Sequence, residues 1–340
     1  MKLAISPLCY LCVLAFVTAA CSDDEPTSTR TLALGPPSVF VQADRLKSPR
    51  GIAVDQSGNV WIADTWNNVL RKLSPQGAQI DSIETPASRP SHITIDRVTG
   101  DLLVIMSDNR FERFVVQTKT LLTSIPFDPF PGDASAVFDV NTRATQQLAL
   151  TVNQLGDIDS SPSGDFFVSA LGAPENSLLK ISNGNVFAIA YSSLAPQSSA
   201  ERGPRFVSID SYGTVYTSFT MLASSSQNIT KTYSLNPSNV TQSNPLNEPV
   251  VSSLAAGSAM DASGNLYVVE PELQELVIFS TTQGTTIGRY QIIDVAGLSL
   301  RKAPQDVAVG SDGTVYVVLN DLQNPTGGPG AVLKYQRISQ

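Results

Sequence analysis

The sequence predicts an all-β fold, a six-bladed β-propeller made of four-stranded antiparallel blades. The first observation is the segment 48–77, in which three short apolar runs alternate with turns, as they do in β-hairpins. The second is that the first hairpin of this segment recurs five times along the chain, each time with a glycine in the turn. A sheet of this size cannot bury both faces alone, so the copies are expected to stack on one another in a ring.

The first copy shows the expected elements most clearly. GIAVD (51–55) is predicted to be its first strand, VWIAD (60–64) its second and VLRKLS (69–74) its third. The residues QSGN and PQG separate these runs and are typical of tight turns. Trp61 lies within the second strand and is expected to pack between blades.

The turn between the first and second strands is the most regular feature of the repeat. Glycine fits this corner because hairpin turns usually need a positive φ, which glycine adopts at little cost. The glycines are 42 to 64 residues apart, which suits four-stranded blades with loops of different length. They are Gly58, Gly100, Gly164, Gly213, Gly264 and Gly313.

Aspartates end four of the first strands just before these turns. Their side chains are expected to cap the backbone amides of the turn, a structural role. They are Asp55, Asp96, Asp210 and Asp261.

Pro49–Asn68, with the pattern P-x-G-I-A-V-D-x-x-G-N-V-W-I-A-D-T-x-N-N, resembles the NHL repeat. The later copies resemble it more weakly, and the resemblance covers 38–340. It implies that the first strand of each repeat is innermost, and that strands from the two chain ends pair to close the ring. The last copy ends with VLKYQRI (332–338) and lacks a fourth strand, which SVFVQA (38–43) is expected to supply.

The N-terminus predicts export. Residues 1–20 have the features of a signal peptide: Lys2, an apolar core over 8–17 that is short for a membrane span, and small residues before Cys21. The run TAAC (18–21) resembles the lipobox of bacterial lipoproteins, which implies acylation of Cys21. Residues 21–37 are acidic and rich in Ser, Thr and Pro, as expected of a flexible tether. The alternative is ordinary secretion into the extracellular space.

Charge and length limit the partners. The formal charge is −8 and charged residues make up 15% of the chain, without a basic stripe that would neutralise phosphates, so nucleic acid is not an expected partner. Membrane contact is expected only through a lipid at Cys21. The propeller accounts for the whole of 38–340, and we expect a monomer that binds a protein or a small molecule.

Several kinds of catalytic site are excluded by residue count. His92 is the only histidine, so a zinc ion held by three imidazoles, as in some propeller lyases, is not available. A Ser-His-Asp device would have to use His92. The sequence has no G-x-S-x-G motif and no Gly-rich phosphate loop. It therefore predicts no catalytic residues and no cofactor, and favours a binding or scaffold module over an enzyme.

A ligand site is expected at the mouth of the central channel, where the first strands begin. Alignment on the turn glycines places a mixture of residue types there rather than one repeated structural residue. Trp66 is added because it lies in a loop after the second strand on the same side. The expected contacts are Arg50, Trp66, His92, Asp157, Arg205 and Phe206.

The alternative is a calcium-dependent hydrolase or lactonase, because six-bladed propellers of the gluconolactonase type bind calcium through carboxylates and amides near the channel. The resemblance implies Asp157 and Asp306 as metal ligands, with His92 as a general base. These aspartates belong to blades 3 and 6, on opposite sides of the ring. Calcium prefers about six oxygens, so loop groups or water would have to complete the site.

The segment 127–154 interrupts the repeat. It contains three phenylalanines beside three aspartates, and two interpretations are open: it folds over one face of the propeller, or it is a disordered flap. Alternation of polar and apolar residues in QQLALTVNQ (146–154) predicts that its last part returns as a strand.

Overall fold

The structure is a computed structural model. It describes residues 32–127, 136–140, 142–147, 151–173, 177–192, 204–224, 227–242, 244–246, 255–292, 302–321, 324 and 326–338. Their regular secondary structure is almost entirely strands, with two short 3₁₀ turns, η1 (Thr65–Asn67) and η2 (Val240–Gln242). None of their helices has the length and apolar character that crossing a membrane requires.

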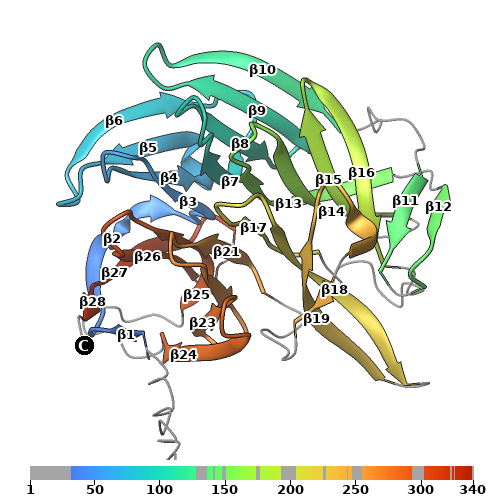
Figure 1. The fold of residues 1–340 in the computed structure, drawn as a ribbon. Helices are drawn as coiled ribbons and strands as arrows, with labels where there is room; N and C mark the ends of the chain where they lie inside the picture. The colour runs from blue at the N-terminus through green and yellow to red at the C-terminus, as the bar shows by residue number, and fades with distance from the viewer. Residues whose placement is uncertain are drawn as a thin grey trace, which may run out of the picture. The chain divides into compact units, whose positions relative to one another are not determined.

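The strands form six sheets around a centre, as the sequence predicts (Figure 1). Blade 1 contains β3 (Gly51–Val54), β4 (Val60–Asp64), β5 (Val69–Leu73) and β6 (Gln79–Glu84). Blade 2 contains β7 (Pro90–Ile95), β8 (Leu102–Met106), β9 (Arg110–Val115) and β10 (Thr120–Pro126). Blade 3 contains β13 (Thr151–Ser160), β14 (Phe166–Ala173), β15 (Ser177–Ser182) and β16 (Asn185–Tyr191).

The second half of the ring repeats this order. Blade 4 contains β17 (Val207–Ile209), β18 (Val215–Ser224), β19 (Gln227–Leu235) and β20 (Asn244–Pro245). Blade 5 contains β21 (Gly257–Met260), β22 (Asn265–Glu270), β23 (Glu275–Ser280) and β24 (Thr285–Gln291). Blade 6 contains β25 (Lys302–Val309), β26 (Val315–Asp321), β27 (Pro329–Tyr335) and, from the other end of the chain, β2 (Ser38–Lys47).

The ring is closed at two levels. The innermost strands contact one another in the cyclic order β3, β7, β13, β17, β21, β25 and back to β3. At the outer edge of blade 6, the N-terminal strand β2 pairs antiparallel with β27, with Val39 opposite Leu333, so the predicted closure by 38–43 is confirmed (Figure 1, blue beside orange). Asp64 ties this closing strand to blade 1, because its Oδ1 accepts the N–H of Lys47 at 2.8 Å.

A short strand pair extends the closure. β1 (Ala33–Leu34) pairs with β28 (Arg337–Ile338), and Leu32 and Leu34 are buried against the core between blades 5 and 6. These residues are at the end of the expected tether, 21–37. The rest of the tether up to Thr31, the expected signal peptide and Cys21 lie outside the described residues.

The hydrophobic core is divided among the blade interfaces. The described residues form six apolar clusters, one between each pair of neighbouring blades. Second strands such as β4 and β8 are buried along their whole length, because both of their faces pack against neighbouring sheets. Trp61 is fully buried in the cluster between blades 1 and 2, as predicted.

The turns follow the sequence prediction closely. All six repeat glycines have φ between 75° and 85°. At Asp210, for example, Oδ1 accepts the N–H groups of Tyr212 and Thr214, both at 2.9 Å. Asp55 and Asp261 accept the equivalent pair of amides, and Asp96 accepts the N–H of Val98 and the hydroxyl of Thr99. Their predicted capping role is confirmed.

The described part of the insertion 127–154 widens blade 3. β11 (Ala136–Asp139) pairs in parallel with the outer strand β16, Phe138 opposite Ala190, and β12 (Thr145–Gln147) pairs with β11 to give a six-stranded sheet. The end of the insertion enters the innermost strand β13, so the predicted return as a strand is confirmed. Residues 128–135, 141 and 148–150 lie outside the described residues.

Candidate functional site

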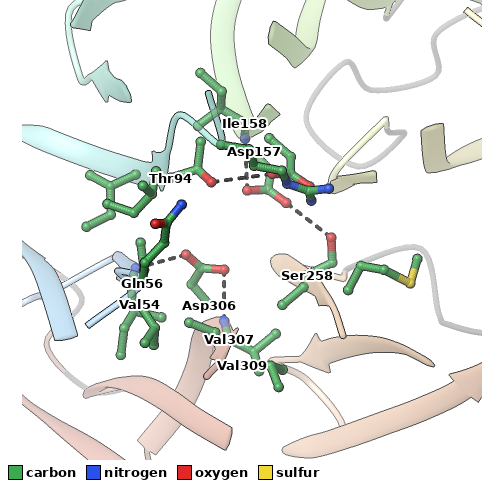
Figure 2. Close-up of a pocket in the computed structure, with 18 residues that line it drawn as sticks. Val54, Gln56, Thr94, Asp157, Ile158, Ser258, Asp306, Val307 and Val309 are labelled. Atoms are coloured by element: carbon green, nitrogen blue, oxygen red, sulfur yellow. Dashed lines mark hydrogen bonds and ion pairs between the residues drawn. The ribbon is translucent and has the colours of Figure 1, made fainter. Parts of the chain in front are cut away.

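The innermost strands enclose a cavity of about 240 Å³ (Figure 2). Its walls come from β3, β7, β13, β21 and β25, together with Gln56 and Arg97 from the turns that follow β3 and β7. Apolar side chains make up much of the wall. The polar side chains that face one another across it include Gln56, Thr94, Asp157, Ser258 and Asp306.

Asp157 and Asp306 join their own blades to the next ones. Asp306 Oδ2 accepts the N–H of Ile52 in blade 1 at 3.0 Å, and Asp157 Oδ2 accepts the N–H of Val207 in blade 4 at 3.0 Å. Each carboxyl group also accepts the N–H of the residue that follows it. An innermost strand has no neighbouring strand on its channel side, so these carboxyl groups pair buried N–H groups that would otherwise lack a partner.

Both carboxyl groups favour the protonated form. Burial raises the pKa of Asp157 to about 8. The pKa of Asp306 lies well above its ordinary value, first because of burial and then because of the negative charge of Asp157. Two buried carboxylates that repel each other cannot both ionise at low cost, so the pair retains protons at neutral pH.

A third carboxyl group, Asp159, is balanced by an arginine. Asp159 Oδ2 accepts the N–H of Ile209 at 2.8 Å and bonds Arg97 Nη2 at 2.9 Å. Burial raises the pKa of Asp159, and the positive charge of Arg97 opposes this shift. Arg97 also donates to the carbonyls of Ile209 and Asp210, so it extends from the blade 2 turn to blade 4 across the end of the cavity where the innermost strands finish.

His92 and Arg50 lie at the other end, where the innermost strands begin. His92 Nδ1 is 3.8 Å from Asp157 Oδ1 and has no hydrogen-bond partner, and 16% of the side chain remains exposed. Burial, and then the positive charge of Arg50, lowers the pKa of His92 to about 4, so its imidazole is neutral at neutral pH. Burial lowers the pKa of Arg50, whose Nε has no hydrogen-bond partner. The mouth thus combines a neutral imidazole, a protonated carboxyl group and a guanidinium.

The structure distributes the other expected contacts differently. Arg205 lies two residues before β17, and its main chain lies against Gly156, next to Asp157. The ring of Phe206 is fully buried in the cluster between blades 4 and 5 and has no surface for a ligand. The ring of Trp66 is already in contact with other residues of the chain. The Arg89 guanidinium lies 3.6 Å from its ring centroid, and Gly327 packs against the ring. Trp66 and Phe206 are therefore left out of the candidate site.

Five polar residues of the cavity are absent from the sequence prediction: Gln56, Thr94, Arg97, Asp159 and Ser258. Asp159 is two residues from Asp157 and lies on the same side of β13, and this spacing was a usable signal. Arg97 and Ser258 gave none, because their partners are in other blades. Ser258 Oγ lies 3.4 Å from Asp157 Oδ2 and 2.7 Å from Ser208 Oγ, which links blades 3, 4 and 5.

The described carboxylates do not by themselves form a calcium site. They contain no group of three or more His, Cys, Asp or Glu side chains that could hold a metal ion. Asp157 and Asp306 use both of their oxygens to accept backbone N–H groups, and the charge of Asp159 is offset by Arg97. The chemistry derived below therefore uses no metal.

Fold and site together define a class: a six-bladed β-propeller with a small, acid-lined central cavity. Comparison with known sequences agrees at this level. Residues 19–109, which contain blade 1 and the first half of blade 2, match the profile of the SMP-30/Gluconolactonase/LRE-like region. No curated protein matches the chain.

Among similar solved structures is the calcium-binding protein regucalcin from Agrobacterium tumefaciens, with 16% identity, a TM-score of 0.56, and coverage of 89% of this chain and 95% of that one. A putative gluconolactonase has 14% identity, a TM-score of 0.56, and coverage of 89% and 94%. Virginiamycin B lyase from Staphylococcus aureus has 13% identity, a TM-score of 0.54, and coverage of 89% and 99%. At these identities the likeness shows the fold alone.

Proposed function

We propose that the protein is a hydrolase that cleaves a small ester or lactone at the mouth of the central cavity. One observation carries this proposal: His92 Nδ1 lies 3.8 Å from Asp157 Oδ1, beside the positive charge of Arg50. The two groups have pKa values shifted in opposite directions, to about 4 and about 8. Pairs whose environments separate their pKa values in this way are suited to acid and base roles.

The roles follow from the protonation states at neutral pH. Neutral His92 accepts a proton from water, whose oxygen attacks the carbonyl carbon. The Arg50 guanidinium stabilises the negative charge that develops on the carbonyl oxygen. Asp157 gives its proton to the leaving oxygen as the carbon–oxygen bond breaks. A proton then passes from His92 to Asp157 across the short gap between them, which restores both groups.

The comparisons support this choice of reaction over a purely structural scaffold. The matched family region carries gluconolactonase in its name, and one similar structure is described as a putative gluconolactonase. Of the three groups given roles, Asp157 lines the cavity of about 240 Å³, and His92 lies beside it. Lyase chemistry that depends on several histidines is not proposed, since the chain has one.

Hydrolysis of a panel of aldonolactones and short acyl esters tests the proposal. We expect turnover that falls about a hundredfold or more in His92→Ala and in Asp157→Asn. The pH profile should be bell-shaped, with limbs near pH 4 and pH 8. Glu272→Gln, on an exposed turn of blade 5, is the matched surface control. Turnover that is equal in all variants, or absent for the whole panel, contradicts the proposal.

Calcium dependence is a separate proposal, carried by the resemblance to gluconolactonase-type propellers rather than by the described donors. Metal analysis of the purified protein tests it directly. One tightly held calcium per chain, lost together with activity on chelation, supports it. Activity that persists in excess chelator contradicts calcium dependence and leaves the His92–Asp157 reaction standing.

The second candidate is a binding module with the same mouth. It is favoured by the hydrogen bonds of Asp157 and Asp306, which serve the fold whether or not a reaction occurs. Here Arg50 and Arg205 would hold an anionic or carbonyl-bearing ligand, and replacing both with alanine should abolish binding without unfolding the protein. Saturable binding of a lactone or sugar acid without turnover separates this function from hydrolysis.

We also propose that the protein is exported and carries a lipid at Cys21. Its repeats are proposed to be of the NHL type, and the propeller is proposed to act as a monomer. Mass spectrometry of the mature N-terminus in a bacterial host tests the attachment. An N-terminal diacylglyceryl-cysteine supports it, and an unmodified N-terminus at another position contradicts it.

A further inference from the structure

We propose a second ligand site, independent of the central cavity and of the proposed hydrolysis, that takes a small organic ammonium ion with an apolar body. It is a cavity of about 310 Å³ between blades 1 and 2, well out from the ring centre. Its walls are the end of β6, the loop that leads to β7, and residues of the next blade from β8, β9, β10 and the turn between β9 and β10. Figure 1 shows these two blades side by side. Cavities that bind small molecules start at about this size.

The floor of this inter-blade cavity is apolar. Ile83, Met106 and Phe114 are buried there, and they continue the hydrophobic cluster between blades 1 and 2 outward. Leu121 covers one side and is about half exposed. An alkyl or aromatic body would gain by burial on this surface.

One hydroxyl group at the cavity has no partner. Thr85 lines the cavity and is 4% exposed, and its Oγ1 makes no hydrogen bond. The backbone of Thr85 is fixed, because its N–H donates to Asn68 and its carbonyl accepts from Ser88. A buried hydroxyl without a partner is costly, so a ligand group that hydrogen-bonds it is favoured.

The charged side chains that line the cavity are two carboxylates and two cations, and both cations also pair with carboxylates outside the lining, Asp108 and Asp81. Glu112 is 5% exposed, and its Oε1 lies 3.3 Å from Arg110 Nη1. Arg110 is shared, because its Nε also pairs with Asp108 at 2.8 Å. Glu84 adds a further carboxylate to the lining, and the ammonium of Lys119 is already paired with Asp81. One guanidinium thus serves more than one carboxylate.

These features specify the ligand. Glu112 and Thr85 together offer acceptors that match the N–H donors of an ammonium group. Burial raises the pKa of Glu112, although the positive charge of Arg110 and a hydrogen bond from Ser124 oppose the rise. Counted together with Asp81 and Asp108, four carboxylates share the two cations Arg110 and Lys119. An anionic ligand would add to this negative charge, and a neutral one would leave it in place.

Isothermal titration with three probes of equal length tests the proposal: hexylammonium, hexanol and hexanoate. We expect hexylammonium to bind at one site, hexanol at least about tenfold more weakly, and hexanoate not at all. Glu112→Gln keeps the side-chain shape and should weaken hexylammonium about tenfold or more. Thr85→Val removes the hydroxyl and should weaken it several-fold without loss of thermal stability.

Two comparison variants locate the binding. Glu272→Gln should leave hexylammonium binding unchanged. If Asp157→Asn abolishes the binding and Glu112→Gln does not, the ammonium ion occupies the central cavity and the proposal is overturned. It is equally overturned if hexanol binds as tightly as hexylammonium, or if no probe binds. The rate of ester or lactone hydrolysis should be the same in Glu112→Gln as in the unmodified protein. The ammonium site and the proposed reaction are therefore tested independently.

Discussion

Two sets of aspartates in this propeller make similar hydrogen bonds over very different distances along the chain. At the turns, Asp210 Oδ1 accepts N–H groups two and four residues further on. In the cavity, Asp157 accepts an N–H fifty residues away, and Asp306 one that is 254 residues away. The turn set stabilises a hairpin, and the cavity set joins one blade to the next.

The contrast extends to charge. At the turn aspartate Asp55, hydrogen bonds and Lys72 lower the pKa despite the opposing effect of burial. The cavity aspartates are buried and mutually repulsive, so their pKa values rise. The aspartates that join neighbouring blades are therefore also the ones that favour the protonated form. A buried carboxyl group of this kind can act as a proton donor in a reaction.

The largest expected effect is that of Asp306→Asn. The amide keeps the size of the side chain but replaces one acceptor with a donor, which would face the N–H of Ile52 or that of Val307. A buried N–H left without a partner costs about 1–3 kcal/mol, so we expect the free energy of unfolding to fall by about that amount. Urea denaturation measures it. An unchanged free energy would mean that the blade junction does not depend on this carboxyl group.

The pH dependence of stability sharpens the comparison. A group with a raised folded-state pKa stabilises fully below its unfolded pKa, and the effect is lost as pH rises towards the folded value. For Asp157 the loss runs from about pH 4 to about pH 8. His92, whose folded pKa is about 4, acts oppositely below pH 6.5, so the window between pH 6.5 and 8 isolates the carboxyl groups.

In that window we expect the free energy of unfolding to fall with rising pH, by up to about 1.4 kcal/mol per pH unit for each such group. Urea denaturation at several pH values provides the measurement. Asp157→Asn should have a shallower slope, because it removes one titrating group. A slope that is flat, or that rises with pH, would show that the cavity carboxyl groups are ionised in the folded protein.

The same comparison explains which features the sequence could predict. Turn glycines and capping aspartates depend on spacing, and each is visible in one stretch of residues. The closing strand was inferred because a strand is missing at one end of the chain and a spare one is present at the other. The bridges from Asp159 and Arg97 to blade 4 depend on neighbours 50 residues or more away, and no local pattern encodes them. The burial of Phe206 was missed because alignment gives a position along a strand, but does not show which face the side chain takes.

A smaller effect is expected at Gly100. Its φ is 75°, and no heavy atom lies within 4 Å of where a Cβ would be, so Gly100→Ala adds backbone strain without a clash. We expect a loss of about 1 kcal/mol in the free energy of unfolding, measured by urea denaturation. A much larger loss would indicate that the turn has a further contact, and no loss would mean that the hairpin readily adopts another turn.

The smallest effect is expected for Asp210→Asn, the same chemical change as at Asp306 in the turn set. The carbonyl oxygen of asparagine can accept both turn N–H groups, and its NH₂ group can donate to the Tyr216 hydroxyl, which lies 3.3 Å from the present Oδ2. Asparagine caps such turns well, so the free energy of unfolding should change by less than about 0.5 kcal/mol. Urea titrations of the two variants in parallel measure the difference. If Asp210→Asn lowers the free energy of unfolding as much as Asp306→Asn does, then burial and connection between blades do not distinguish the two sets of aspartates.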